Sequence, residues 1–516
     1  MFNILQNHIK SLVLLSIATT VIVILVVYII LSRNVETNNS DLDFPDGFLI
    51  GAGSSAFQIE GAWNTSGKSA SEMDNLLHQK NSIFPNILDI SSDSYHHYLE
   101  DVKALKFMGM NAYRFSLSWS RLLPTGYANI VNPDGVRYYH SLLDELEKNQ
   151  IQPIVTIYHF DHPYSLEKFG AWTNEKIVEI FADYARFVFK EFGHRVKIFS
   201  TINEPRIVSM LYASNWLKSV DKRNHSAGYL CGHNLLKAHA RAFHIYDEEF
   251  RPKYNGLIGI VLNCDSSYTM NPNDHELNNI MFDYNCGWFA NPIFSSTGDY
   301  PETLKKRVAE NSKFEGLSES RLPIFTDAWN DYIRGSSDYF GLNHYNTYLV
   351  SRSPKMNETI WQDDIGIMIT YDPRTFAKYP QNYTVSYMRP YGIREVLVKI
   401  KDNYNNPLVL ITESGVPSMD DLHDYSRIKY LYVFMEQVLY AIKKDKCNVK
   451  SYIIWSLIDG YEFFSNYVYG FGLIRVDFND PNRRRTPKAS AMWLKNVIAK
   501  KRLYFDVNEQ FENVNF

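Results

Sequence analysis

The chain has 516 residues, of which 45% are hydrophobic, 15% aromatic and 21% charged, and its formal net charge is −4. This length and apolar content allow a large core and exclude an intrinsically disordered chain. Because Lys and Arg are dispersed, the composition shows no nucleic-acid footprint, and we expect no nucleic-acid partner. The many aromatic residues suit stacking on sugar rings, but large barrels also bury many aromatics, so composition does not decide.

An uncharged apolar run occupies residues 12–31, after a short amino-terminal segment at 1–11. These twenty residues are just long enough to cross about 30 Å of hydrocarbon as a helix. A cleaved signal peptide would have a shorter apolar region of about 7–15 residues and a small-residue cleavage site. We therefore favour a transmembrane signal anchor in the lipid bilayer over a secreted, cleaved form. Residues 1–11 are then cytoplasmic, and residues 32–43 form a polar stalk.

Glycosylation motifs and cysteines bear on which side of the membrane the rest of the chain lies. Five Asn-x-Ser/Thr sequons support a lumenal or extracellular body, as in a type II membrane protein, and they begin at Asn38, Asn64, Asn224, Asn357 and Asn382. Such motifs are frequent by chance, so they only support this orientation. The four cysteines are too sparse for a disulfide scaffold and permit three full pairings; they are Cys231, Cys264, Cys286 and Cys447.

From residue 44 to residue 505, strand-like apolar runs alternate with amphipathic stretches without a linker or repeat. The expected strands are 48–52, 112–116, 153–158, 198–202, 257–262, 339–342, 408–411 and 452–455. The expected helices include 101–108, 138–148, 175–192, 235–250 and 428–443. This alternation predicts an α/β fold with one closed (β/α)8 TIM barrel, followed by a polar tail at 506–516. A doubly wound open sheet is the main rival, but no Gly-x-Gly-x-x-Gly turn follows the first strand.

Polar residues stand at or just beyond the ends of these strands, where such barrels build their active sites. They are Gln58, Arg114, His159, Asn203, Glu204, Asn343, Glu413 and Trp455. The two glutamates each follow a β-branched apolar run, and Pro205 or Gly415 ends the strand just beyond. A carboxylate at the exit of a buried strand is desolvated, which is costly unless it has partners or a task. Two convergent carboxylates are what a retaining glycosidase requires.

Nine short motifs follow one another in the order of a known family. They are FPDGF (44–48), FQIEGAW (57–63), YRFS (113–116), YH (158–159), TINEP (201–205), WFANP (288–292), GLNHY (341–345), ITESG (411–415) and WSLID (455–459). Through them the chain closely resembles glycoside hydrolase family 1, the β-glucosidase and lactase-like enzymes that also include the klotho proteins. Asn-Glu-Pro alone would be a weak signal, but this many motifs in family order make coincidence implausible.

The resemblance implies a retaining mechanism carried by the two glutamates. Glu413 matches the nucleophile that forms a glycosyl-enzyme ester, and Glu204 matches the general acid that later activates water. Their carboxyl groups should then lie about 5–5.5 Å apart. Arg114 and Tyr345 match positions beside the nucleophile, where a guanidinium would keep Glu413 ionised, although Arg114 could instead form a purely structural ion pair. The nearby negative charge would raise the pKa of Glu204 and hold it protonated.

The resemblance also implies a sugar subsite. The residues that match hydrogen-bonding partners of the glycone hydroxyls are Gln58, His159, Asn203 and Glu462. Trp455 matches the platform beneath the sugar ring, and Asn203 would contact the 2-hydroxyl, a bond that strengthens in the transition state. This chemistry needs no organic cofactor, and the His and Cys residues show no zinc-type clustering. We therefore expect neither a cofactor nor a metal.

Four positions depart from the family pattern. Ser414 replaces the Asn after the nucleophile and is a small polar substitute. Phe463 replaces a Trp whose N–H donates to a sugar hydroxyl, and the loss of that donor would cost about 0.5–1.5 kcal/mol. Gly460 replaces a frequent Asn, and Gly470 replaces an Arg in a region that borders the pocket. These departures leave the choice among glucose, galactose and fucose open.

The sequence thus predicts a membrane-anchored retaining β-glycosidase that hydrolyses β-D-glucosides or related β-glycosides. The alternative is a klotho-like receptor or glycan-binding protein that keeps the barrel with little or no turnover, but the presence of both glutamates favours the enzyme. A plant-type thioglucosidase usually carries Gln as its acid/base residue, so Glu204 argues against that class. Transglycosylation uses the same intermediate, and the sequence does not separate it from hydrolysis. The aglycone, the organelle and the oligomeric state are likewise left open.

Overall fold

The computed structural model describes residues 39–79, 86–214, 226–353, 364–370, 389–418, 422–463 and 466–505. By its internal contacts the chain divides into residues 1–43 and residues 44–516. The described part of the first unit contains a short 3-10 helix, η1 (Asn39–Leu42). The expected anchor at 12–31, most of the stalk, the tail at 506–516 and four of the five sequons lie outside the described residues. Within the described ranges, no helix has the length and apolarity to span a bilayer.

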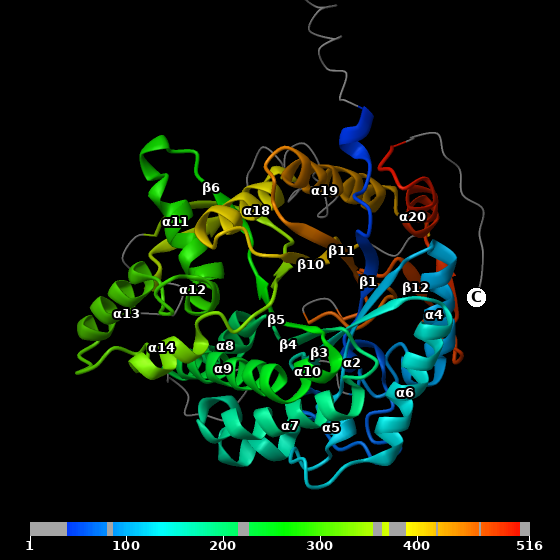
Figure 1. Ribbon diagram of the computed structural model, residues 1–516, viewed down its shortest axis with the longest axis horizontal. Coiled ribbons are helices and arrows are strands. Elements are labelled where there is room, and N and C mark those ends of the chain that lie inside the picture. Colours follow the sequence, from blue (N-terminus) through cyan, green and yellow to red (C-terminus); the bar gives the residue numbers. More distant parts are fainter. Residues whose placement is uncertain are drawn as a thin grey trace, which may run out of the picture. The chain divides into compact units, whose positions relative to one another are not determined.

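Eight parallel strands of the second unit close into a barrel (Figure 1). Round the barrel they are β1 (Leu49–Gly53), β11 (Val449–Trp455), β10 (Val409–Ser414), β7 (Phe340–Asn343), β5 (Leu257–Asn263), β4 (Ile198–Asn203), β3 (Gln152–Tyr158) and β2 (Ala112–Ser116). All eight expected strands are present, with small shifts at their ends, so the TIM-barrel prediction is confirmed. They read as continuous apolar runs because helices cover the outside of a parallel sheet and side chains fill its inside.

Helices surround the barrel strands (Figure 1). The longest are α4 (Ser94–Met108), α6 (Pro133–Lys148), α7 (Lys176–Phe192), α9 (Ser226–Ile245), α13 (Glu302–Phe314), α18 (Tyr391–Asn403), α19 (Tyr425–Lys443) and α20 (Ala489–Lys500). Shorter helical elements are α2 (Ala56–Ile59), α3 (Glu72–Leu77), α5 (Trp119–Leu122), η2 (Tyr164–Phe169), η3 (Ala171–Thr173), α8 (Pro205–Ala213), η4 (Tyr246–Phe250), α10 (Arg251–Tyr254), η5 (Pro272–Asp274), α11 (Glu276–Phe282), η6 (Asp283–Gly287), α12 (Trp288–Phe294) and α14 (Asp327–Ile333).

Local sequence explains where these helices begin and which face they bury. At the start of α6, the Asn132 side chain accepts from the backbone N–H of Asp134, and Pro133 occupies the first turn, where its missing N–H costs nothing. In α7, Ile177, Phe181 and other apolar residues recur at spacings of three and four and are buried. This spacing gives α7 one apolar face, which packs against α9 and the inside of the fold.

Two small sheets were not expected from the sequence. One joins β6 (Ser266–Tyr268), β8 (Thr347–Arg352) and β9 (Ile367–Thr370), and the other pairs β12 (Ile474–Val476) with β13 (Arg485–Pro487). β6 follows β5, and β8 follows β7, so the first sheet is built on the carboxyl-terminal side of the barrel. Its strands are short and partly exposed, so they lack the apolar alternation that marks a strand in sequence.

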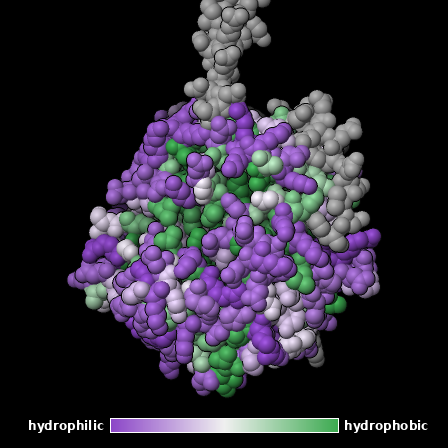
Figure 2. All heavy atoms as spheres, turned by 45° about the vertical axis from the view of Figure 1, so that its right-hand side comes forward, coloured by the Kyte–Doolittle hydropathy of each residue, from purple (hydrophilic) through white to green (hydrophobic). Residues whose placement is uncertain are grey.

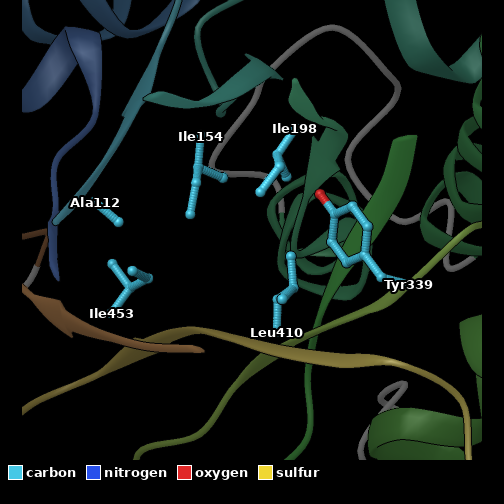
Figure 3. Packing of buried hydrophobic residues seen from close by; sticks show 6 residues of the cluster. All are labelled: Ala112, Ile154, Ile198, Tyr339, Leu410 and Ile453. Atoms are coloured by element: carbon cyan, nitrogen blue, oxygen red, sulfur yellow. The ribbon is translucent and has the colours of Figure 1, made fainter. Parts of the chain in front are cut away.

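A cluster of apolar side chains fills the barrel towards the amino-terminal ends of its strands. Figure 3 shows its members pointing toward one another; they are Ala112, Ile154, Ile198, Tyr339, Leu410 and Ile453. All six are buried, and Ile154, Tyr339 and Ile453 have no exposed surface. The barrel interior is therefore a packed core and not a pore, which leaves the carboxyl-terminal end for a site.

The outer surface of the barrel unit is mostly hydrophilic in the view of Figure 2, with hydrophobic residues in separate groups. The most exposed large apolar side chains in the described chain include Ile324 and Phe314, at 86% and 78%. Ile324 therefore offers an exposed isoleucine to compare with Ile453, which is fully buried.

We expect Ile453→Ala to lower the free energy of unfolding by about 2–5 kcal/mol, because it removes buried methyl groups and leaves a cavity at the barrel centre. Ile324→Ala removes the same atoms from an exposed site and should change stability by no more than about 0.5 kcal/mol. Chemical denaturation of both variants measures the difference. Equal losses would contradict the assignment of Ile453 to the core.

Candidate active site

Irregular backbone places both glutamates at the carboxyl-terminal end of the barrel. The pairing of β4 with β5 shifts register between Ser200 and Asn203, and the pairing of β10 with β7 shifts between Ile411 and Glu413. Such bulges re-aim side chains and are common beside active sites. Glu204 also has a left-handed backbone, with φ of +46°, a strained conformation for a residue other than glycine. The surrounding fold must therefore hold Glu204 in place.

Glu413 is buried between a cation and a phenol. Its Oε1 accepts from Arg114 Nη1 at 2.5 Å, and its Oε2 accepts from Tyr345 Oη at 2.7 Å. The Arg114 and Glu413 side chains are only 0% and 5% exposed, so water screens this ion pair little. Burial and the Glu413 charge raise the pKa of Tyr345 well above its ordinary value, so its hydroxyl stays a donor. Both carboxylate oxygens are thus fixed by protein groups.

A hydrogen-bond network joins this ion pair to the second glutamate. Arg114 Nη2 donates to Asn203 Oδ1 at 2.7 Å. Asn343 Nδ2 donates to the same Asn203 oxygen at 3.2 Å and to Glu204 Oε1 at 2.9 Å. Thr412 in turn donates to Asn343 Oδ1 at 2.7 Å, which fixes the orientation of that amide. Residues from four strands therefore hold the two carboxyl groups in one assembly.

The two carboxyl groups have opposite electrostatic environments. Desolvation, followed by the negative charge of Glu413, raises the pKa of Glu204 from 4.5 to about 8. The hydrogen bond from Asn343 works in the other direction but does not cancel these effects. Glu204 is therefore protonated at neutral pH, whereas Glu413 has the Arg114 charge beside it. This is the pattern that separates an acid from a nucleophile in a retaining site.

His159 lies beside this network as a neutral ring. Burial, helped by the charge of Arg114, lowers its pKa well below 6.5. Its Nε2 lies 3.3 Å from Asn203 Nδ2, and its ring stacks on Trp455 with centroids 5.8 Å apart. Because Nε2 accepts from the Asn203 amide, Nδ1 carries the proton, and it has no hydrogen-bond partner among the described residues.

The segment after β11 adds another carboxyl group and an apolar wall. Trp455 Nε1 donates to Glu462 Oε1 at 3.3 Å, and desolvation raises the pKa of Glu462 to about 8. The Phe463 ring lies 5.5 Å from the ring of Phe57 and 5.8 Å from that of Phe160. Phe463 therefore completes an aromatic group and offers no side-chain donor.

Gln58 is largely held by the protein itself. Its Nε2 donates to the carbonyl of Tyr461 at 2.7 Å, and its Oε1 accepts from the Ser55 hydroxyl. One N–H and one lone pair of the amide remain for another partner. The structure thus places the ten catalytic and sugar-binding candidates at the same end of the barrel, in one connected region. They are Gln58, Arg114, His159, Asn203, Glu204, Tyr345, Glu413, Trp455, Glu462 and Phe463.

The departures from the family pattern are accommodated locally. The Ser414 hydroxyl accepts from Tyr452 Oη at 3.0 Å. A Cβ at Gly470 would lie 2.3 Å from Asp459 Oδ1, which forms a buried ion pair with Lys488 at 2.8 Å. A Cβ at Gly460 would lie 2.9 Å from the Ile59 side chain. Both glycines therefore occupy positions where the present packing has no room for a side chain.

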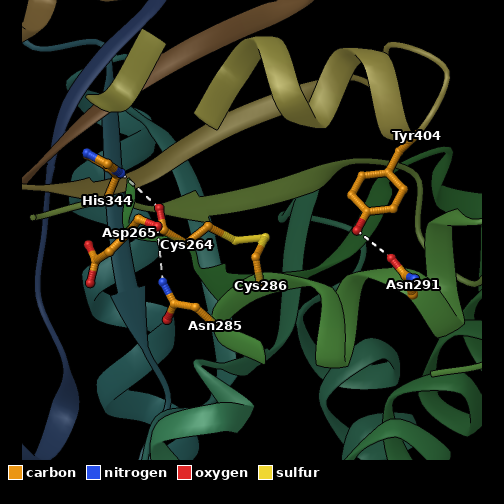
Figure 4. The surroundings of a disulfide bond; sticks show 7 residues. All are labelled: Cys264, Asp265, Asn285, Cys286, Asn291, His344 and Tyr404. Atoms are coloured by element: carbon orange, nitrogen blue, oxygen red, sulfur yellow. Dashed lines mark hydrogen bonds between the residues drawn. A yellow bond between two sulfur atoms is a disulfide. The ribbon is translucent and has the colours of Figure 1, made fainter. Parts of the chain in front are cut away.

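A disulfide immediately precedes Asp265, which binds the backbone of Tyr345; Figure 4 shows the disulfide and Asp265. Cys264 and Cys286 are bonded, which resolves the pairing that the sequence left open, while Cys231 and Cys447 are free and buried. Asp265 Oδ1 accepts from the backbone N–H groups of Tyr345 and Asn346 at 3.1 and 2.9 Å. The Asp265 carbonyl accepts from Asn285 Nδ2 at 3.1 Å.

Sequence reasoning assigned no role to Asp265 or Thr412, and it named Asn343 only as a residue at a strand end. Asp265 follows β5 as closely as the catalytic candidates follow their strands, so the same rule could have found it. Within the described ranges, no group of three or more His, Cys, Asp or Glu side chains is arranged to hold a metal ion.

A TIM barrel with paired carboxyl groups at its carboxyl-terminal end defines a glycosidase class, and comparison with known proteins gives the family. A sequence model described as "Glycosyl hydrolase family 1" matches residues 40–503. The chain belongs to glycosyl hydrolase family 1 and is therefore an O-glycosyl hydrolase of the retaining, β-glycosidase type.

Relatives of known name and structure agree with this assignment. A cytosolic β-glucosidase of Homo sapiens is 39% identical over 464 residues, which span 88% of this chain and 98% of that protein. The structure of an aphid myrosinase superposes with a TM-score of 0.83 at 37% identity, covering 89% of this chain and 99% of the other. A mutant of a rice β-glucosidase in a covalent complex with Glc has a TM-score of 0.79 at 33% identity, covering 88% of this chain and 99% of the other.

We expect Glu204→Gln to stabilise the protein, and increasingly so as pH rises. The pKa of Glu204 is raised from 4.5 to about 8 in the folded state, so between these values the unfolded chain loses a proton that the folded chain keeps. The contribution of Glu204 to wild-type stability is therefore fully present below about pH 4.5 and is lost towards pH 8, and the glutamine removes this part of the pH dependence. Thermal denaturation midpoints at pH 5 and pH 8 measure it. A stability difference that does not change with pH would contradict the raised pKa.

Proposed function

We propose that this protein hydrolyses β-D-glucosides or related β-glycosides by double displacement, with Glu413 as nucleophile and Glu204 as acid/base. The observation that carries the proposal is the contrast between the two carboxyl groups. Glu413 accepts two hydrogen bonds, one of them from a guanidinium, whereas Glu204 is desolvated, protonated and held by a neutral amide. We expect their carboxyl groups to lie about 5–5.5 Å apart, as retention requires.

In the first step, a Glu413 oxygen attacks the anomeric carbon, and the bond from that carbon to the leaving oxygen breaks. The proton of Glu204 moves to the leaving oxygen, so the aglycone departs as a neutral alcohol. Arg114 and Tyr345 aim the nucleophile while Glu413 changes from a carboxylate to an ester. Glu204, now ionised, is ready to act as a base.

In the second step, Glu204 takes a proton from water, whose oxygen attacks the anomeric carbon. The ester bond to Glu413 breaks, and the sugar leaves with its original β configuration. An acceptor alcohol could replace water in this step and give transglycosylation. The covalent complex that the rice β-glucosidase forms with Glc supports the same route for this chain.

The sugar would lie on the side of Glu413 lined by neutral donors and an aromatic platform. We propose that the unpartnered His159 N–H, the Asn203 amide and the free N–H of Gln58 bind glycone hydroxyls. Trp455 lies 5.8 Å from the His159 ring and offers its face to the sugar, and Glu462 reaches further hydroxyls. Phe463 adds apolar surface and no donor, so contact at that edge of the sugar is weaker.

A receptor that kept the barrel without turnover would not require this contrast in protonation. The Asn203 amide would serve binding as well, but the network from Arg114 through Asn203 and Asn343 to Glu204 also joins a paired carboxylate to a protonated carboxyl group, which binding alone does not need. It therefore supports the enzyme over the klotho-like alternative.

We also propose that residues 12–31 anchor the protein in a bilayer and that the barrel lies on the lumenal or extracellular side. The support is the length and lack of charge of that run and the five sequons. A Cys264–Cys286 disulfide is consistent with an oxidising compartment.

Glu413→Ala should abolish hydrolysis of an aryl β-glucoside, and added azide should restore turnover to give the α-glucosyl azide. The shortened side chain leaves room for azide at the attacking face, where a single displacement inverts the anomeric carbon. Product configuration is read by NMR. Glu204→Ala is the matched control, and with azide it should give the β-glucosyl azide, because the normal nucleophile still acts first. If azide rescues neither variant, the assignment of these roles is wrong.

The rate of glycosylation should fall as pH rises through about 8, because Glu204 then loses the proton that the leaving oxygen needs. This alkaline loss in kcat/KM should be marked for an alkyl β-glucoside and weak for a 2,4-dinitrophenyl β-glucoside, whose leaving group needs no proton. Glu462 also has a pKa of about 8, but its titration would affect both substrates alike. Identical pH profiles for the two substrates would refute the acid role of Glu204.

A further inference from the structure

Arg206 is a cation beside the acid/base residue with no acidic partner in the described chain. It lies in the first turn of α8, two residues after Glu204. Its contacts are with neutral groups: Nη1 lies 3.2 Å from Met210 Sδ, and the guanidinium faces the side-chain amide of Asn263. With the oxygen of that amide turned toward the arginine, Oδ1 accepts from Nε at 3.2 Å and from Nη2 at 2.5 Å.

This lack of an acidic partner distinguishes Arg206 from the fully buried arginines, although half-buried Arg483 also contacts only carbonyl oxygens. The five buried arginines of the described chain each form an ion pair with Asp or Glu; they are Arg114, Arg121, Arg321, Arg427 and Arg485. Arg206 is half-buried, so it is partly desolvated and yet still accessible. A partly desolvated guanidinium is a ready binding site for an anion.

The strand register places Arg206 at the level of the reacting groups. Asn263 is the last residue of β5, and its Cα pairs with that of Asn343 on β7. Asn343 donates to Glu204 Oε1 at 2.9 Å. The guanidinium that contacts Asn263 therefore lies beside the carboxyl group that protonates the leaving oxygen. The glycone-binding candidates His159 and Trp455 come instead from β3 and β11.

A role for Arg206 in tuning the acid does not explain its presence. Its positive charge lowers the pKa of Glu204, against the effect of burial and of Glu413. A cation that disfavours the protonated acid opposes the first chemical step. Asp265, the acidic group two residues after Asn263, uses its Oδ1 for the two N–H groups of Tyr345 and Asn346. The positive charge of the guanidinium is thus not paired with an acidic side chain of the described residues, and no other role within the protein explains it.

We propose that Arg206 selects β-glycosides whose aglycone carries an anionic group, such as a carboxylate, near the glycosidic oxygen. This inference rests on the proposed function, because Glu204 must protonate the leaving group for Arg206 to face the aglycone. The guanidinium would donate to the anion through N–H groups on its solvent side while Asn263 holds its other edge. Partial exposure makes the attraction sensitive to salt.

The test compares two aryl β-D-glucosides that differ in charge and little in shape, with a carboxylate or a primary carboxamide at the same ring position. We expect the wild type to favour the carboxylate in kcat/KM, and Arg206→Met to lower kcat/KM for the carboxylate by roughly tenfold while changing the carboxamide by less than about threefold. Arg206→Lys should retain part of the preference. Taking the ratio between variants cancels differences in leaving-group ability.

Arg137→Met is the matched control, because Arg137 is an exposed arginine on α6 that is paired with Asp134. It should leave both substrates unaffected. Raising the ionic strength to 1 M should weaken the wild-type preference and leave the carboxamide unchanged. Equal losses for both substrates in Arg206→Met would show a structural role and overturn the inference, as would an Arg206→Met variant in which neither substrate loses kcat/KM.

The inference and the proposed function fail in different ways. If the wild type hydrolyses both glucosides and Arg206→Met leaves the ratio of their kcat/KM values unchanged, the enzyme stands and the aglycone preference is wrong. If it hydrolyses neither, the proposed function fails, and calorimetric binding of the same two glucosides then tests Arg206 directly. Tighter binding of the carboxylate that is lost in Arg206→Met would support the anion site, and equal binding would reject it.

Discussion

The buried ion pair between Arg114 and Glu413 is the interaction on which the rest of the site depends. Arg114 has no exposed surface, and its second terminal nitrogen orients Asn203. Loss of either charge would leave the other buried and uncompensated, at a cost of about 3–5 kcal/mol. The same ion pair keeps a negative charge near Glu204 and so contributes to its raised pKa. One contact between β2 and β10 therefore pairs the charge of Glu413 and adds to the larger effect of desolvation on Glu204.

The barrel supports this arrangement with irregular backbone beside both glutamates. Register shifts occur in β4 and β10 just before the two glutamates, and Glu204 itself adopts a left-handed conformation. Toward the other end of the strands, a dry apolar cluster fills the interior. The packed apolar cluster and the irregular strand ends together hold the two glutamate side chains in place. Without that support, the two buried carboxyl groups would move apart or turn toward water.

Much of this could be predicted from the sequence. The strands were found because buried parallel strands are continuous β-branched runs, and the site residues because they follow those runs. Hydrogen bonds to backbone groups could not be predicted, because every residue has a backbone carbonyl and nearly every residue a backbone N–H. Examples are the bond from Gln58 to the Tyr461 carbonyl and the bond from the Asn346 N–H to Asp265. The strands β6, β8 and β9 are short and half-exposed, and propensity does not identify such elements.

The bond between Cys264 and Cys286 ties the end of β5 to the helical segment η6, immediately before Asp265. Asp265 in turn holds the backbone that carries Tyr345, whose hydroxyl touches Glu413. Material made in a bacterial cytosol, where thiols stay reduced, would lack this tether. Evidence that a recombinant preparation is folded therefore does not show that this disulfide has formed. The number of free thiols should be measured for every preparation that is assayed.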